Sequence, residues 1–316
     1  MINLYLHSFS LRCHFRFVDD FDVFSFIDRT AAWGFSGVSI SANRPGYRHL
    51  CGTTPEHFEK VREHIVSHQL LCDLDTSGTS PDHLRTLLEI AQAVGASKLR
   101  TYTRHSGSPE EMIALSVRDL KEVAPIAEET GVTVMFENHE DFTGPQVARI
   151  LNEVDSPWVR ALYDYGNSMM VLEDPLEALE AMGEFAVNAH LKDHVMVSPE
   201  HSPDGKLSVL GVPIGQGNLP IVEITRRLIN AGTRDITFEN VWGYRAPVKV
   251  ALDTNTQLGS GVFSYATPPF EPECALPGME ALAEKNPQQF VALENAVMDD
   301  GVEWLKRELR ITQLIT

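Results

Sequence analysis

The sequence predicts an α/β protein built as one closed (β/α)8 barrel. From residue 1 to about 240, short apolar runs alternate with longer segments of helical periodicity, which is typical of repeated βα units around a parallel sheet. Eight apolar runs are present, and eight parallel strands are the number that closes a barrel of this kind. The predicted strands are Ile2–Phe9, Gly37–Ile40, Leu70–Asp75, Lys98–Thr103, Val132–Asn138, Val159–Asp164, Phe185–Lys192 and Asp235–Asn240.

Several helices between these strands have recognisable ends. A Ser-Pro or Asp-Pro pair supplies an N-cap with proline in the first helical position, and a glycine follows the last turn. At Ser108-Pro109-Glu110-Glu111 the spacing also predicts a capping box. The predicted helices begin at Ser80-Pro81, Ser108-Pro109 and Asp174-Pro175, and they end at Gly95, Gly131 and Gly183.

The pattern changes after the eighth strand. We expect a single domain over residues 1–316, with the barrel in 1–242, a long loop or arm in 243–277 and C-terminal helices in 278–316. The arm carries scattered glycine, proline, threonine and serine without a period. It is predicted to cover the barrel mouth or to meet another subunit, because its apolar side chains would otherwise face water. These side chains are Val262, Phe263, Tyr265 and Phe270.

Composition excludes several classes of function. The chain has 44 acidic and 26 basic residues, and its formal charge of −18 opposes binding to nucleic acid or to an anionic membrane surface. No apolar run approaches the roughly 18 residues of a membrane span. The four cysteines form no CxxC pair and the N-terminus has no signal-peptide pattern, so we expect a reduced, cytoplasmic protein.

Four polar residues stand at the ends of consecutive predicted strands. Active sites of such barrels lie where the strands end, so these side chains should converge on one rim. Three unpaired carboxylates close together would repel one another, and a divalent cation is the simplest compensation. Mostly oxygen ligands with one imidazole favour Mn²⁺, with Mg²⁺, Co²⁺ or Fe²⁺ as alternatives. The four candidate ligands are Glu137, Asp164, His190 and Glu239.

Five short motifs stand at or near the predicted strand ends. They are Glu137-Asn138-His139, Asp164-x-x-Asn167, His190-Leu191-Lys192-Asp193, Gly215-Gln216-Gly217-Asn218 and Glu239-Asn240. In these motifs the chain resembles the xylose isomerase-like TIM barrels, a family that includes tagatose and psicose 3-epimerases, hydroxypyruvate isomerase and inosose dehydratase. The resemblance covers about residues 1–242. It implies a metal ion on the four ligands and places Glu137 and Glu239 on either side of the substrate carbon that exchanges a proton.

Further polar and aromatic residues near the strand ends are candidates for the site. His139 follows Glu137 by two residues and either transfers protons or bonds to a loop carbonyl. Lys192 stands in the same relation to His190 and either stabilises an oxyanion or pairs with an acidic neighbour. The candidates for contacts with a sugar are His7, Asn167 and Trp242.

Three classes of function remain open. The first is a sugar isomerase or epimerase that transfers a proton beside a metal-bound carbonyl through an enediolate. The second is a lyase that eliminates a substituent from a 3-oxo-sugar, as in inosose dehydratase or the catalytic subunit of C-glycoside deglycosidases. The third is a non-catalytic sugar-binding barrel. We expect a small carbohydrate substrate and a homo-oligomer, or a complex with a small β-rich subunit if the deglycosidase interpretation holds.

Overall fold

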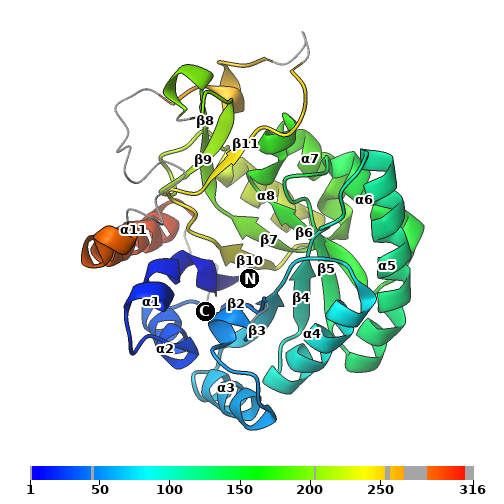
Figure 1. Ribbon diagram of the computed structural model, residues 1–316, viewed down its shortest axis with the longest axis vertical. Coiled ribbons are helices and arrows are strands. Elements are labelled where there is room, and N and C mark those ends of the chain that lie inside the picture. Colours follow the sequence, from blue (N-terminus) through cyan, green and yellow to red (C-terminus); the bar gives the residue numbers. More distant parts are fainter. Residues whose placement is uncertain (1, 44–45, 203, 253–256, 267–282, 310–316) are drawn as a thin grey trace.

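Eight parallel strands close into a barrel in the order β1-β10-β7-β6-β5-β4-β3-β2 (Figure 1). The computed structural model describes residues 2–43, 46–202, 204–252, 257–266 and 283–309. Each barrel strand lies within two residues of its predicted bounds, which confirms the predicted fold. The strands are β1 (Asn3–His7), β2 (Gly37–Ser41), β3 (Leu71–Asp75), β4 (Lys98–Thr101), β5 (Thr133–Glu137), β6 (Val159–Asp164), β7 (Ala186–Leu191) and β10 (Asp235–Phe238).

Helices surround the barrel, and the predicted caps determine where several of them start and stop. The Ser108 capping box is formed, and Gly95 and Gly131 end their helices in the left-handed conformation. No helix in the described ranges has both the length and the apolar character needed to cross a membrane. The helices are α1 (Arg12–Phe17), α2 (Val23–Trp33), α3 (Pro55–Ser67), α4 (Pro81–Val94), α5 (Pro109–Thr130), α6 (Gly144–Val154), α7 (Pro175–Met182), α8 (Ile221–Ala231) and α11 (Pro287–Glu308).

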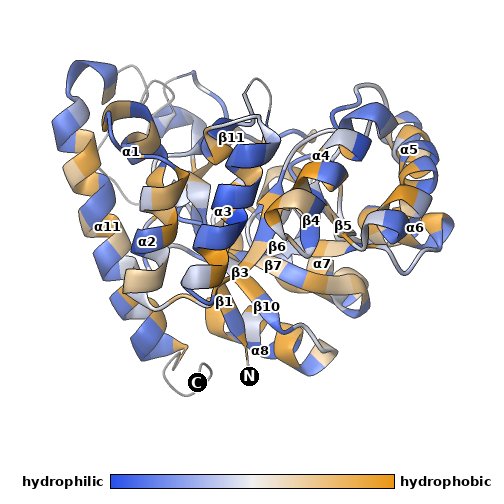
Figure 2. Cartoon of the chain, turned by 90° about the horizontal axis from the view of Figure 1, so that it is seen from below, coloured by the Kyte–Doolittle hydropathy of each residue, from blue (hydrophilic) through white to orange (hydrophobic). Residues whose placement is uncertain are grey.

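The main hydrophobic core lies between the helices and the outer face of the barrel. Helical residues such as Leu87, Val123 and Ile150 are fully buried against outward-facing strand residues. Figure 2 shows the same division, with hydrophobic residues on the inner faces of the helices and hydrophilic residues outside. This packing fixes the strand ends, and therefore the residues that follow them, in a rigid ring.

A three-stranded antiparallel sheet stands beside the barrel mouth and was not predicted. Strands β8 (Asp193–Val197) and β9 (Ser208–Val212) form a hairpin directly after β7, and β11 (Arg245–Pro247) pairs with β9 (Figure 1). The arm in 243–277 is therefore partly a strand and not only a loop. A strand of three residues that pairs with a distant partner leaves no clear period in the sequence. Phe270 lies outside the described residues.

The C-terminal segment 279–314 was predicted to be helical, and its described part forms α11 after Pro287. This helix packs beside α1 through the buried carboxylate of Glu294. That carboxylate accepts hydrogen bonds from the backbone N–H groups of Cys13 and His14 at 2.9 and 3.1 Å, and it bonds to His14 Nδ1 at 2.6 Å. Glu294 thus satisfies two amides at the start of α1 and attaches the last helix to the barrel.

The interior of the barrel carries charge below the strand ends. Asp73 is fully buried and accepts a hydrogen bond from Asn188 Nδ2 at 3.0 Å. Lys98 Nζ lies 3.3 Å from Asp73 Oδ2 and 2.7 Å from Asp235 Oδ2. Burial raises the pKa of Asp73 to about 7, although the attraction of Lys98 opposes this rise. The free energy of unfolding must therefore depend on pH through this carboxyl group.

Asp73→Asn should remove that dependence. The pKa of Asp73 is higher in the folded chain than its ordinary value of 3.8, so its contribution to stability is present at low pH and is lost as the pH rises towards 7. Urea unfolding midpoints at pH 5 and pH 8 measure the effect. We expect the midpoint of the variant, relative to the parent protein, to increase between these two values. The exposed Asp300→Asn on α11 is the control, and an equal response of both variants would contradict the assignment.

Candidate metal centre

The four predicted ligands meet around the imidazole of His190. Its Nδ1 atom lies 3.1 Å from Glu137 Oε1, 3.5 Å from Glu239 Oε2 and 3.8 Å from Asp164 Oδ2. Glu137, Asp164 and His190 are fully buried, and Glu239 is nearly so. Donor atoms of Glu137 on β5, Asp164 on β6 and His190 on β7 lie within 4.8 Å of one another, and Glu239, directly after β10, approaches the same imidazole.

Neighbouring backbone and amide groups hold these ligands in place. Asn138 bridges β5 and β6, because its Oδ1 accepts from the N–H of Asp164 at 2.6 Å and its Nδ2 donates to the Asp164 carbonyl at 3.2 Å. Asp164 Oδ1 accepts from the N–H groups of Gly166 and Asn167, both at 2.9 Å. Of this carboxylate, only Oδ2 then faces the candidate metal centre. These hydrogen bonds give the asparagine of the Glu-Asn motif and the backbone of the Asp-x-x-Asn motif a structural role.

Two cationic side chains already compensate part of the negative charge. Arg100 pairs with Glu137, and Lys192 pairs with Glu239 and, at 2.6 Å, with Asp164 Oδ2. Burial alone would raise the pKa of Glu137, but Arg100 and His190 outweigh it and hold that pKa well below its usual range. Lys192 thus pairs with acidic neighbours, one of the two roles expected for it.

The donor set fits a divalent ion. Among the described residues, Glu137 Oε1 and both ring nitrogens of His190 have no hydrogen-bond partner, and Asp164 Oδ2 and Glu239 Oε2 have only the ion pairs with Lys192. Buried polar atoms without partners are rare and call for a ligand. An ion held by Glu137, Asp164, His190 and Glu239 would occupy this point, while Asp75 Oδ1, 3.4 Å from His190 Nε2, would orient the ring from behind.

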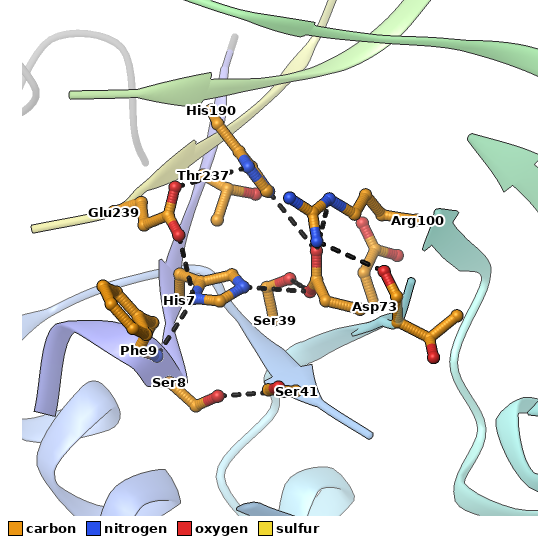
Figure 3. Close-up of polar contacts among 12 residues, drawn as sticks. His7, Ser8, Phe9, Ser39, Ser41, Asp73, Arg100, His190, Thr237 and Glu239 are labelled. Atoms are coloured by element: carbon orange, nitrogen blue, oxygen red, sulfur yellow. Dashed lines mark hydrogen bonds and ion pairs between the residues drawn. The ribbon is translucent and has the colours of Figure 1, made fainter. Parts of the chain in front are cut away.

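His7 belongs to this outer layer of contacts. Its Nδ1 accepts from the N–H of Phe9 at 3.0 Å, so its Nε2 carries the proton and points to Asp75 Oδ2 at 3.5 Å (Figure 3). Glu239 Oε1 lies 3.7 Å from His7 Nδ1. Figure 3 shows the contacts of His7 with Glu239 and with the backbone of Phe9. Arg100 Nε lies 3.9 Å from the other oxygen of the Asp75 carboxylate, Oδ1. His7 therefore faces Asp75, which lies behind the His190 ring, and it also borders the cavity.

Two sequence motifs form one structural unit behind the site. The Asp193 carboxylate accepts hydrogen bonds from the N–H groups of Gly215 and Gly217 at 2.9 and 2.8 Å. A Cβ atom on Gly217 would stand 2.0 Å from Asp193 Oδ1, so only glycine allows this approach. The glycine turn therefore serves to anchor the His190-Leu191-Lys192-Asp193 run, and its amides are not free to bind phosphate.

A cavity of about 310 Å³ opens above the centre. Of the predicted residues, His7, His139, Asn167, Lys192 and Glu239 line it. Such a volume lies at the lower end of ligand pockets, roughly 300 to 1,000 Å³, and suits a small carbohydrate.

Four predicted residues are not on the cavity wall: Glu137, Asp164, His190 and Trp242. Glu137 is covered by Arg100, so the two glutamates do not both face the cavity. Trp242 is buried and stacks on Phe290 of α11, with ring centroids 6.3 Å apart, so the structure does not bring it to the sugar pocket. An aromatic residue shortly after a strand is a weak indication of a substrate contact, because such residues pack equally often in the hydrophobic interior.

Other wall residues were missed from the sequence, although alternation could have indicated them. Residues two apart on an extended strand end share a face. Arg100, Tyr102 and Arg104 follow this spacing after β4, and His194 extends the His190-Lys192 series. Tyr102 stacks on His139 with centroids 3.7 Å apart. Burial is the main cause of the low pKa of His139, about 4, and its imidazole is therefore neutral near pH 7.

Asp164→Asn and Glu239→Gln should each lose the ion while the barrel stays folded. Each change removes one anionic ligand, and we expect affinity to fall by more than about a hundredfold, beyond the roughly 10–100-fold effect of outer contacts. Elemental analysis after dialysis against Mn²⁺ measures the bound ion. Glu128→Gln, on the exposed side of α5, is the matched control. Retention of a full equivalent by both ligand variants would refute the centre.

Comparison with known proteins supports the fold. One curated relative is the uncharacterized protein YihM of Escherichia coli (strain K12), 26% identical over 159 residues, which are 50% of this chain and 48% of the relative. Another is a 3-oxo-isoapionate decarboxylase of Pectobacterium atrosepticum, 27% identical over 202 residues, 63% of this chain and 70% of the relative. The chain thus spans about half the length of the first relative.

A solved xylose isomerase-like TIM barrel protein from Mycobacterium smegmatis, in complex with magnesium, shares the fold. Its TM-score is 0.57 at 13% identity, and the match covers 94% of this chain and 98% of that one. The family model described as xylose isomerase-like TIM barrel matches residues 27–258. With the barrel and the four strand-end residues in place, the chain belongs to the xylose isomerase-like TIM barrel family.

Proposed function

We propose that the protein is a Mn²⁺-dependent lyase that releases the carboxylate of a 3-oxo sugar acid as carbon dioxide. The family supports a carbohydrate-modifying enzyme of the isomerase, epimerase or lyase type. The Pectobacterium relative is a decarboxylase by name, and its substrate is named as a 3-oxo acid. The positive charge of the cavity wall is the observation that favours decarboxylation over the other reactions.

The cavity wall concentrates positive charge in an acidic protein. Five cationic side chains line it against four carboxylates, whereas the whole chain has 26 against 44. Among the described residues Arg104 forms no ion pair, and its guanidinium lies 5.2 Å from the ring centroid of Tyr102. A planar guanidinium at the mouth is suited to a bidentate contact with a carboxylate. The cations are Arg48, Arg100, Arg104, Lys192 and Lys249.

The reaction follows from this distribution of charge. Arg104 binds the substrate carboxylate, and the bond from that carboxylate to the carbon beside the 3-oxo group breaks. The electron pair moves onto the 3-oxo oxygen, carbon dioxide leaves, and the carbon then takes one proton. Lys192 and Arg100 stabilise the oxygen that gains charge, and His139 passes the proton from the cavity. A bound divalent ion would supply Lewis-acid stabilisation at that oxygen.

Isomerisation or epimerisation is the second candidate, and one observation favours it. Glu239 and His139 both line the cavity and could exchange a proton with a substrate carbon. Epimerisation through two glutamates is less well supported, because Glu137 lies beneath Arg100. Elimination from a 3-oxo glycoside remains the other lyase reaction compatible with the same groups.

Arg104→Gln should weaken the use of acidic substrates selectively. Loss of a charge-assisted hydrogen bond, about 1.5–3 kcal/mol, predicts a KM for 3-oxo sugar acids at least about tenfold higher, with a smaller change in kcat. Carbon dioxide release from the Mn²⁺-loaded enzyme is the measurement. Arg85→Gln, an exposed arginine on α4, is the matched control. Interconversion of neutral ketoses without carbon dioxide release would move the assignment to the second candidate.

His139→Ala should keep its metal ion and lose more than about a hundredfold in kcat, the lower end of what a positioned proton donor contributes. Elemental analysis and turnover are measured on the same preparation. His201→Ala, at an exposed 3-10 turn, provides the control. A loss below about tenfold, together with C3 interconversion of free ketohexoses, would support epimerisation instead.

A further inference from the structure

Three metal-binding side chains gather on the outside of the barrel, away from the cavity. Asp28 comes from the middle of α2, and His64 and His68 come from the C-terminal end of α3. The two helices lie side by side around the barrel (Figure 1). One donor atom from each of the three residues lies within 4.8 Å of the others. The cluster shares no residue with the strand-end site.

Helical geometry brings both imidazoles to one side. Residues four apart on a helix lie one above the other, so His64 and His68 face α2 together. His64 Nε2 lies 2.7 Å from Asp28 Oδ1 and His68 Nε2 lies 2.9 Å from the same oxygen. The His64 ring is held edge-on by Phe24 of α2, with centroids 5.3 Å apart. Both Nε2 atoms therefore point at one place.

We propose that Asp28, His64 and His68 bind a second divalent transition-metal ion, of the kind that prefers imidazole: Zn²⁺, Ni²⁺, Cu²⁺ or Co²⁺. Two imidazole nitrogens and one carboxylate oxygen are a common ligand set for such ions, with bonds of about 2.0–2.2 Å. The present N···O separations would open slightly to admit the ion. Mg²⁺ and Mn²⁺ favour oxygen ligands and belong to the barrel centre instead.

A simple surface ion pair explains the cluster less well. Such pairs contribute at most about 1 kcal/mol, and they need only one histidine. Here two imidazole rings share one carboxylate oxygen, and their side chains are only 30% and 32% exposed. With an ion bound, all three groups would be satisfied at once and α2 would be tied to α3. Solvent would fill the remaining coordination positions.

Zinc titration of the Mn²⁺-loaded protein tests the site. Isothermal titration calorimetry with Zn²⁺ alone should show one equivalent with a dissociation constant at or below about 10 μM, a moderate affinity on the usual scale. His64→Ala, His68→Ala and Asp28→Asn should each weaken it by more than about tenfold. Co²⁺ should give ligand-field absorption bands in the parent protein that the His64→Ala variant lacks. Zinc binding at this site should also raise the Tm of the parent protein and not that of the three ligand variants.

A variant of the barrel centre distinguishes zinc bound at the outer site from zinc that enters the barrel centre. The Asp164→Asn variant should retain the outer equivalent, because none of its three ligands has changed, whatever reaction the barrel catalyses. His201→Ala controls for exposed histidines in general. Equal zinc binding by the parent protein and the folded His64→Ala/His68→Ala double variant would overturn the proposal, and so would the absence of any zinc equivalent in Asp164→Asn.

Discussion

His190 lies fully buried at the centre of the strand ends, with carboxylates from β5, β6 and the end of β10 around one ring nitrogen and Asp75 behind the other. Removing several ionised carboxylates from water costs several kcal/mol for each group unless each is paired. Arg100 and Lys192 provide part of that pairing, and an ion held by the four candidate ligands would supply the rest. The arrangement of the site follows from this need for compensation.

The same constraint explains why the surrounding loops are so closely specified. Lys192 reaches Asp164 from the position directly after β7, and the turn that contains Gly215 and Gly217 holds the next residue, Asp193, by donating its amides to that carboxylate. Along the chain, the hairpin β8-β9 connects these two motifs. A rigid turn therefore keeps an ammonium group, two carboxylates and the imidazole in fixed register, which is the preorganisation that electrostatic stabilisation requires.

Periodic features of the sequence predicted the barrel and the strand ends on which the four candidate ligands stand. The strand ends of Glu137, Asp164 and His190 could be read because apolar runs stop there and parallel strands end on one rim. Arg100 was overlooked because a basic residue inside a strand gives no sign of which acid it meets. Likewise β11 depends on pairing with β9, some 35 residues earlier, which no local pattern encodes.

The candidate metal ligands and the residues that could select a substrate lie on different parts of the fold. The ligands stand on strand ends that the core holds rigid, whereas Arg104, Tyr244 and Lys249 come from loops and from the arm after β10. Tyr244 and Lys249 both contact Glu140, so the arm and the loop after β5 form one wall of the cavity. Substitutions in that wall can alter which substrate enters without disturbing the ion-binding residues. With Glu137 covered by Arg100, the reaction proposed above would take its proton from the side of Glu239 and His139, which suits a reaction that needs one proton delivered and none carried across the substrate.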